Sequence, residues 1–248
     1  MRWTRLLRAE LRKLATTRMP LAFLVVLVAI SAITATAVIV GNDADGSKGF
    51  IATAADQQSL MAFAANAMVI AGLFGAIAVA REYAHNTVIP MFLVAPRRHR
   101  AVLAQQAAVL IGGALLGLAG AALTVAAVAL ALPTTDYGFL VSAGGVARVL
   151  LASAFTGAAG AVLGAGIGAI VRNTGGAVTG AVLVLIVAPP LIVQLADGTA
   201  PWMPSPLANV VSGVSGETGL LGALLALCAW ALVPAVIGLL AVERRDVV

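Results

Sequence analysis

The residues best suited to polar chemistry stand together in one stretch, EYAHNTVIPMFLVAPRRHR, at positions 82–100. It contains both histidines of the chain, one glutamate and three arginines, and it separates two long apolar runs. Its carboxylate and guanidinium groups can form charge-assisted hydrogen bonds with a partner. Its apolar side chains, among them Met91 and Phe92, can fill a pocket on that partner. The alternative is a solvated basic loop that serves only membrane topology, but such a loop would not need these apolar residues.

The rest of the chain has no pattern typical of a catalytic or metal site. The single cysteine, Cys228, lies in an apolar run, so there is no disulfide framework and no thiolate metal site. The segment GNDADGSKG at 41–49 lacks the Lys-before-Ser/Thr order of a phosphate loop and the full ligand set of a calcium loop. We therefore expect no catalytic residues, no bound metal or cofactor and no enzyme activity in this chain.

The composition identifies the elements that must position residues 82–100. Hydrophobic residues make up 61% of the 248 residues and charged residues only 10%, with a mean hydropathy of +1.05. A soluble domain carries about 25% charged residues, so the sequence predicts an all-α integral membrane protein with one transmembrane domain over 1–248. The basic residues stand at the ends of apolar runs, which is typical of membrane topology and does not indicate nucleic-acid binding.

Six apolar runs are long enough to cross a membrane as helices. A helix rises about 1.5 Å per residue, so a hydrocarbon core of about 30 Å needs about 20 apolar residues. The predicted spans are 20–40, 61–80, 106–132, 147–171, 175–195 and 220–242. None has Asp, Glu, Lys or His deep inside it. Such charges usually serve an ion or proton pathway, so their absence argues against an ion-coupled transporter and against an intramembrane protease.

The distribution of lysine and arginine predicts the orientation. With six spans, 13 of the 15 basic residues fall on the side of the two termini, and only Lys48 and Arg148 fall on the other side. Basic loops stay in the cytoplasm. We therefore expect both termini and the stretch 82–100 to be cytoplasmic.

The leader at 1–19 has the pattern of an amphipathic helix. One stripe carries Trp3, Leu7, Leu11 and Leu14, and basic residues, including Arg5, Arg8 and Arg12, occupy much of the remaining surface. This pattern predicts a helix in the cytoplasmic headgroup plane, with its arginines near anionic lipid. A positively charged topology anchor without a further role is an equal alternative.

Glycines and prolines inside the spans predict how the helices pack and bend. Gly113 and Gly117, and likewise Gly160, Gly164 and Gly168, are spaced by four, a pattern that lets helix backbones approach closely in lipid. We interpret it as packing within one bundle rather than as a dedicated dimer face. Pro189, Pro190 and Pro234 interrupt the fifth and sixth spans. We expect kinks there that shape a path or a hinge.

Together, the basic amphipathic leader, the six spans and the segment REYAHNTV…APRRHRAVLAQ resemble the permease subunit of type-2 ABC exporters. This bacterial family includes exporters of drugs, lantibiotics and lipids or polysaccharides. The most specific part follows the second span, where many members read E-[YF]-x-x-G-T and then a proline and arginines. The residues that match are Glu82, Tyr83, Thr87, Pro96, Arg97, Arg98 and Arg100, whereas Asn86 stands in place of the usual glycine.

The resemblance implies a short coupling helix between the second and third spans that docks on a separate ATPase subunit. It also implies that the leader borders that subunit, that ATP and Mg²⁺ are bound by two ATPase copies, and that a second permease subunit, identical or related, completes the exporter. The weakly polar interior favours a hydrophobic or amphipathic cargo. The alternative function is a non-transporting membrane protein, such as an immunity factor or a sensor partner, which would have no ATPase partner.

Overall fold

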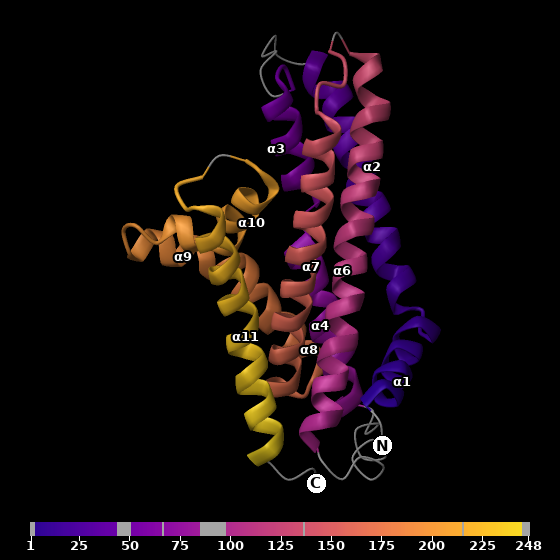
Figure 1. Cartoon of the computed structure of the whole chain (residues 1–248), viewed down its shortest axis with the longest axis vertical. Coiled ribbons are helices and arrows are strands. Elements are labelled where there is room, and N and C mark those ends of the chain that lie inside the picture. Colours follow the sequence, from indigo (N-terminus) through magenta and orange to yellow (C-terminus); the bar gives the residue numbers. More distant parts are fainter. Residues whose placement is uncertain are drawn as a thin grey trace.

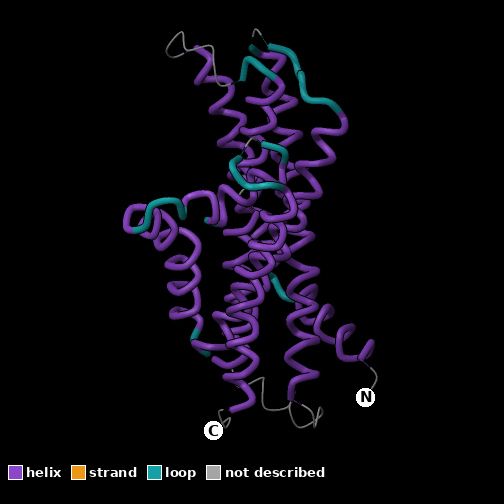
Figure 2. The backbone as a smooth tube through the Cα atoms, turned by 60° about the vertical axis from the view of Figure 1, so that its left-hand side comes forward, coloured by secondary structure: helices purple, strands orange, loops and turns teal. Residues whose placement is uncertain are grey.

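The computed structural model describes residues 3–43, 51–65, 67–84, 98–135, 137–214 and 216–244. In these ranges the chain is helical and contains no strand (Figures 1 and 2). Six stretches are long and apolar enough to cross a membrane, as the sequence predicted. They are Met19–Val40, Ala54–Ala84, His99–Thr134, Ala143–Val171, Thr174–Leu195 and Leu220–Glu243. The second stretch begins seven residues before the predicted span at 61–80, because the outer connection itself folds into helix.

The helices that build these stretches follow one another with short connections. The first half comprises α1 (Trp3–Thr16), α2 (Met19–Asp43), α3 (Ala54–Ala65), α4 (Ala67–Ala84) and α6 (Arg98–Ala131), which ends in a 3₁₀ turn, η1 (Leu132–Thr134). The second half comprises α7 (Ala143–Val171), α8 (Thr174–Val182), the π-helical turn η2 (Leu183–Val187), α9 (Ala188–Leu195), the 3₁₀ turn η3 (Ala200–Trp202), α10 (Pro204–Ser212) and α11 (Leu220–Arg244).

Helix α7 is the central element of the bundle. It packs against α4, α6 and α11, and also contacts α8 and α10. Most residues in the spans formed by α7 and by α3–α4 are buried, whereas fewer than a quarter are buried in the first, fifth and sixth spans. Helix α1 and the last turn of α11 lie at the same end of the bundle (Figure 1). We call this end the basic end, because it carries most of the arginines.

The predicted glycine series on α7 lies along its contact with α4. A Cβ at any of these three positions would collide with a backbone carbonyl of α4. The pairs are Gly160 with Met68, Gly164 with Gly72, and Gly168 with Ala76. Residue numbers rise by four on both helices, so the two helices run in the same direction in register. Only residues without a side chain allow the two backbones to come this close. The close contact stabilises the helix pair through dispersion, because the hydrophobic effect does not drive helices together in lipid.

The other predicted glycine pair lies on the contact between α6 and α7. A Cβ on Gly113 would collide with the carbonyl of Gly157, and one on Gly117 with the carbonyl of Ser153. Here the numbers run in opposite directions, as expected for antiparallel neighbours. Helix α7 is thus held on two faces by backbone-to-backbone contact, and α4, α7 and α6 form a closely packed unit.

The fifth span is bent at its two prolines. Pro189 and Pro190 fall in the first turn of α9, directly after η2, where the Ala188 N–H donates to the Leu183 carbonyl five residues back. Helix α9 leaves the direction of α8 and points sideways from the bundle (Figure 1). By contrast, α11 remains helical on both sides of Pro234, whose backbone packs closely on Gly166 of α7.

The connection between the fifth and sixth spans contains α10, a helix outside the predicted spans. Its last carbonyls are paired with side chains from two other helices. Arg148 of α7 donates from Nε to the Val211 carbonyl and from Nη2 to the Val210 carbonyl, each at 3.3 Å. Gln58 Nε2 of α3 donates to the Ser212 carbonyl at 2.8 Å. These bonds satisfy backbone acceptors that a helix end otherwise leaves open.

Candidate functional site: a charge cluster at the basic end

The leader and the last turn of α4 meet in one cluster of three charged side chains, Glu10, Lys13 and Glu82. Helix α1 packs on α6 and contacts α2, which turns Glu10 and Lys13 toward the bundle. Lys13 Nζ lies 2.8 Å from Glu82 Oε1 and 2.7 Å from Glu10 Oε2. One ammonium thus joins two carboxylates that are far apart in the sequence. We call these three residues the junction cluster.

The junction cluster lies largely out of water. The side chains of Glu10 and Glu82 are 11% and 14% exposed, whereas that of Lys13 is 45% exposed. Burial raises the pKa of the Glu10 carboxyl despite the nearby ammonium. Burial also works against the charge of Lys13, but the two carboxylates together outweigh it and raise the pKa of the lysine.

Next to the junction cluster, Tyr83 connects α4 to the far side of the bundle. The Arg172 guanidinium lies over the Tyr83 ring, 5.3 Å from its centroid, within the range of a cation–π contact. Arg172 Nη2 also donates to the Ala241 carbonyl of α11 at 3.2 Å. Arg172 ends α7 in the left-handed backbone region, with φ 58°, and its N–H donates to the Gly168 carbonyl. The ends of α4, α7 and α11 are therefore linked through one arginine.

A second, weaker link joins the start of α6 to the end of α11. His99 Nδ1 lies 4.0 Å from Glu243 Oε1, and both side chains are nearly half exposed. Exposed pairs of this kind contribute less than about 1 kcal/mol, and this one requires a protonated histidine. The contact nevertheless places the end of residues 82–100 beside the last turn of α11.

A cavity of about 210 Å³ opens beside the junction cluster, between the leader and the end of α4. Lys13, Thr16, Thr17, Arg81 and Glu82 supply its polar wall. The site therefore offers both signs of charge and several hydrogen-bonding groups at the point where α1 and α4 meet. Among the residues that the structure describes, no group of three or more metal-binding side chains comes together.

The structure describes part of the predicted coupling segment. Glu82 and Tyr83 lie in the last turn of α4, and Arg98 and Arg100 belong to the first turn of α6. The arginines therefore extend a membrane helix rather than a separate coupling element. Thr87, Pro96 and Arg97, with the predicted coupling helix itself, lie outside the described residues.

The predicted faces of the leader are partly reproduced. Leu7, Leu11 and Leu14 are half-buried, whereas Trp3 is 43% exposed. The basic positions Arg5, Arg8 and Arg12 are exposed, on the side away from the bundle. The apolar stripe thus lies mainly against protein, because α1 packs on α6.

The sequence analysis did not single out Glu10, Lys13 or Arg172 as site residues. Glu10 and Lys13 are three apart, a spacing that places two side chains on one helix face and could have indicated an ion pair. Neither Lys13–Glu82 nor Arg172–Tyr83 has a local signal, since both pairs join residues far apart in the chain.

Comparison with known proteins adds no relative. A scan against protein-family models and a search of curated proteins both found no match.

Proposed function

We propose that this chain is the membrane-spanning permease subunit of an ATP-driven exporter of the type-2 ABC class. Two copies of a separate ATPase subunit would bind ATP and Mg²⁺, and a second permease subunit, identical or related, would complete the assembly. The chain would lie in a bacterial cell membrane with both termini in the cytoplasm, and it would have no catalytic activity of its own.

The observation that carries the proposal is the contact of Lys13 with Glu82. The resemblance assigns the leader and residues 82–100 to the same ATPase-facing surface. These two segments are joined here by a 2.8 Å ion pair. A partner that pushes on this surface would displace α1 and α4 together. Because α4 packs on α7 through backbone contacts, the displacement would reach the centre of the bundle.

The chemistry of the spans supports an external source of energy. They carry no Asp, Glu, Lys or His deep in the apolar runs that could bind a coupling ion or proton. Closure of an ATPase pair could instead switch the bundle between an inward-accepting and an outward-releasing state, since two-state transitions need a ligand or partner that favours one state. The bends at η2 and Pro189 mark where such a change can be absorbed.

The test is co-expression with the ATPase encoded in the neighbouring reading frame. The complex is purified in detergent, and ATP hydrolysis is measured in nanodiscs. We expect stoichiometric association, and a loss of about tenfold in ATPase affinity, corresponding to about 1.4 kcal/mol, in Arg97→Ala/Arg100→Ala. The matched control is Arg244→Ala/Arg245→Ala, which removes the same charge from a part of the chain outside both the leader and residues 82–100.

If no ATPase associates with the wild-type protein, the exporter proposal fails and a non-transporting membrane protein becomes the better reading. Equal ATPase affinity in the two double variants would show that residues 82–100 act only through general charge. That result would remove the coupling role from this segment.

A further inference from the structure

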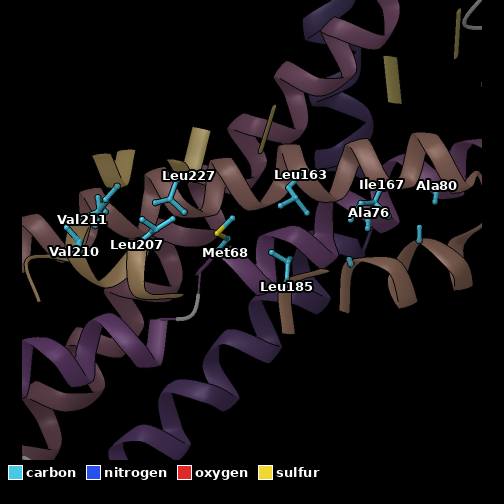
Figure 3. Packing of buried hydrophobic residues seen from close by; sticks show 14 residues of the cluster. Met68, Ala76, Ala80, Leu163, Ile167, Leu185, Leu207, Val210, Val211 and Leu227 are labelled. Atoms are coloured by element: carbon cyan, nitrogen blue, oxygen red, sulfur yellow. The ribbon is translucent and has the colours of Figure 1, made fainter. Parts of the chain in front are cut away.

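A cavity of about 260 Å³ lies far from the junction cluster, among α4, α7, the bent fifth span and α10. Its inner wall includes Met68, Ser153, Thr156 and Leu185, all buried. Its mouth is lined by exposed residues of the fifth span and α10, among them Pro190. We call it the proline cavity, because prolines of both α9 and α10 line it. Figure 3 shows Met68 and Leu185 facing the same space, with Leu207 of α10 beside them.

Two prolines of the fifth span leave backbone carbonyls without their α-helical donors. Proline has no N–H, so Pro189 and Pro190 cannot donate to the carbonyls four residues earlier, as an α-helix requires. Those carbonyls belong to Leu185 and Ile186, which are both lining residues. Pro204, the first residue of α10 and also in the lining, likewise brings no N–H. The prolines therefore reduce the number of backbone donors among the lining residues.

The side chains of the lining supply both acceptors and donors. The Thr156 hydroxyl donates to the Ala152 carbonyl at 2.9 Å, and the Ser212 hydroxyl donates to the Ala208 carbonyl at 2.9 Å. With their protons engaged inside their own helices, both oxygens can only accept from a ligand. The hydroxyls of Ser153 and Ser205 and the Asn209 amide can donate as well as accept. None of the described lining residues is Asp, Glu, Lys, Arg or His.

We propose that the proline cavity binds an uncharged amphipathic molecule with a compact apolar body and a hydroxyl or N–H group that forms hydrogen bonds with the polar groups of the lining. A charged ligand would find no counter-charge in the lining, and burying an unpaired ion costs several kcal/mol. A purely apolar ligand would cover carbonyl and hydroxyl oxygens without a hydrogen bond, which costs about 1–3 kcal/mol per group. A donor-bearing ligand avoids both costs. The identification of this ligand as the cargo rests on the proposed function. The binding of the ligand to the cavity does not depend on that function.

The test uses two fluorescent probes of nearly equal size, 2-naphthol and 2-methylnaphthalene, of which only the first can form hydrogen bonds. Binding is measured by equilibrium dialysis to the permease alone in nanodiscs, and the partition into empty nanodiscs is subtracted. One added hydrogen bond contributes about 0.5–1.5 kcal/mol, so we expect a preference for 2-naphthol of about 2- to 10-fold. Equal specific binding of the two probes, or no specific binding, would overturn the proposal.

Two pairs of variants locate the site. Ala208→Phe fills the cavity and should abolish specific binding of 2-naphthol, whereas Ala229→Phe, at an exposed position of α11, should leave it unchanged. Pro190→Ala supplies an N–H for the Ile186 carbonyl and should reduce the preference for 2-naphthol. Its control, Pro234→Ala, removes a proline outside this cavity. Wild-type binding of 2-naphthol in Ala208→Phe would place the site elsewhere and refute the proposal.

The ATPase is absent from this experiment, so the two proposals fail separately. If the preference for 2-naphthol holds and no ATPase associates with the chain, the exporter proposal falls and the binding site stands. If an ATPase associates and the probes bind equally, only the binding proposal falls.

Discussion

Replacement of Lys13 by methionine tests whether the junction cluster holds the leader on the bundle. The change keeps most of the volume of the side chain and removes the ammonium that Glu10 and Glu82 share. These carboxylates, 11% and 14% exposed, would then face each other without a cation between them. The expected result is a lower free energy of unfolding and a leader that leaves its place beside α4.

The size of the effect follows from the burial of the three groups. Removing one partner of a fully buried ion pair costs about 3–5 kcal/mol, and removing an exposed one costs less than about 1 kcal/mol. The Lys13 side chain is 45% exposed and water screens part of its interaction, whereas its partners are nearly buried. We therefore expect Lys13→Met to lower the free energy of unfolding by about 2 kcal/mol at pH 7.

This loss should shrink in acid. Burial already raises the pKa of the Glu10 carboxyl above its ordinary value, and without the ammonium this pKa is higher still. Folding then takes up protons, and stability is lost as pH rises through the folded-state pKa. The deficit of Lys13→Met relative to the wild type should therefore decrease when the pH is lowered from 7 toward the ordinary glutamate pKa of 4.5.

The assay is reversible unfolding in mixed micelles, combined with double-mutant cycles of Lys13→Met with Glu82→Gln and with Glu10→Gln. Each cycle isolates one pair, and we expect a coupling free energy of about 1 kcal/mol in each. Hydrogen exchange of α1 reports whether the leader detaches. A Lys13→Met protein within about 0.3 kcal/mol of the wild type, with unchanged exchange in α1, would refute this account of the cluster.

Three further predictions concern single positions. Glu10→Gln should be neutral or stabilising at pH 7. Any gain in stability over the wild type should vanish as the pH falls through the raised pKa of Glu10, because the protonated wild type no longer buries a charge. Chemical unfolding at several pH values measures this difference. Gly164→Ala should lower the melting temperature by several degrees, because the added Cβ would collide with the Gly72 carbonyl. In Gly222→Ala the added Cβ has no atom within 4 Å, so this variant should raise the melting temperature slightly. Similar shifts in both variants would contradict the packing described. Arg148→Ala should leave the Val211 carbonyl without its side-chain donor, remove one of two donors from the Val210 carbonyl, and increase hydrogen exchange at the end of α10 at least tenfold. Exchange equal to the wild type would contradict this role.

Much of the architecture follows from local sequence. The six spans could be counted because a membrane helix must keep about 20 apolar residues together, and the structure has six such stretches. The bend at Pro189 and Pro190 was also expected, since proline removes a helical hydrogen bond wherever it falls inside a span. Helix α10 was missed, because nine residues with two prolines in the first turn give little helical pattern, and its carbonyls are satisfied by Arg148 and Gln58 from elsewhere in the chain.

The candidate site was also predicted only in part from the sequence. Glu82 and the arginines of residues 82–100 were visible as a polar stretch, and the leader as an amphipathic helix. That Lys13 reaches Glu82, or that Arg172 covers Tyr83, depends on how α1, α4 and α7 pack, and no spacing in the sequence encodes those distances. The sequence likewise does not tell whether the apolar stripe of the leader faces lipid or protein, since such a stripe suits both.

By itself, the sequence determined that this chain resides in a membrane, how many times it can cross, and where its charges stand along the chain. These properties depend on the transfer of single residues from water to lipid, which is local. Tertiary structure decided which charges meet, which glycines touch a neighbouring backbone, and where a cavity with polar but uncharged side chains remains. Those outcomes depend on the relative positions of helices distant in sequence, and close backbone packing sets them to within an ångström or two.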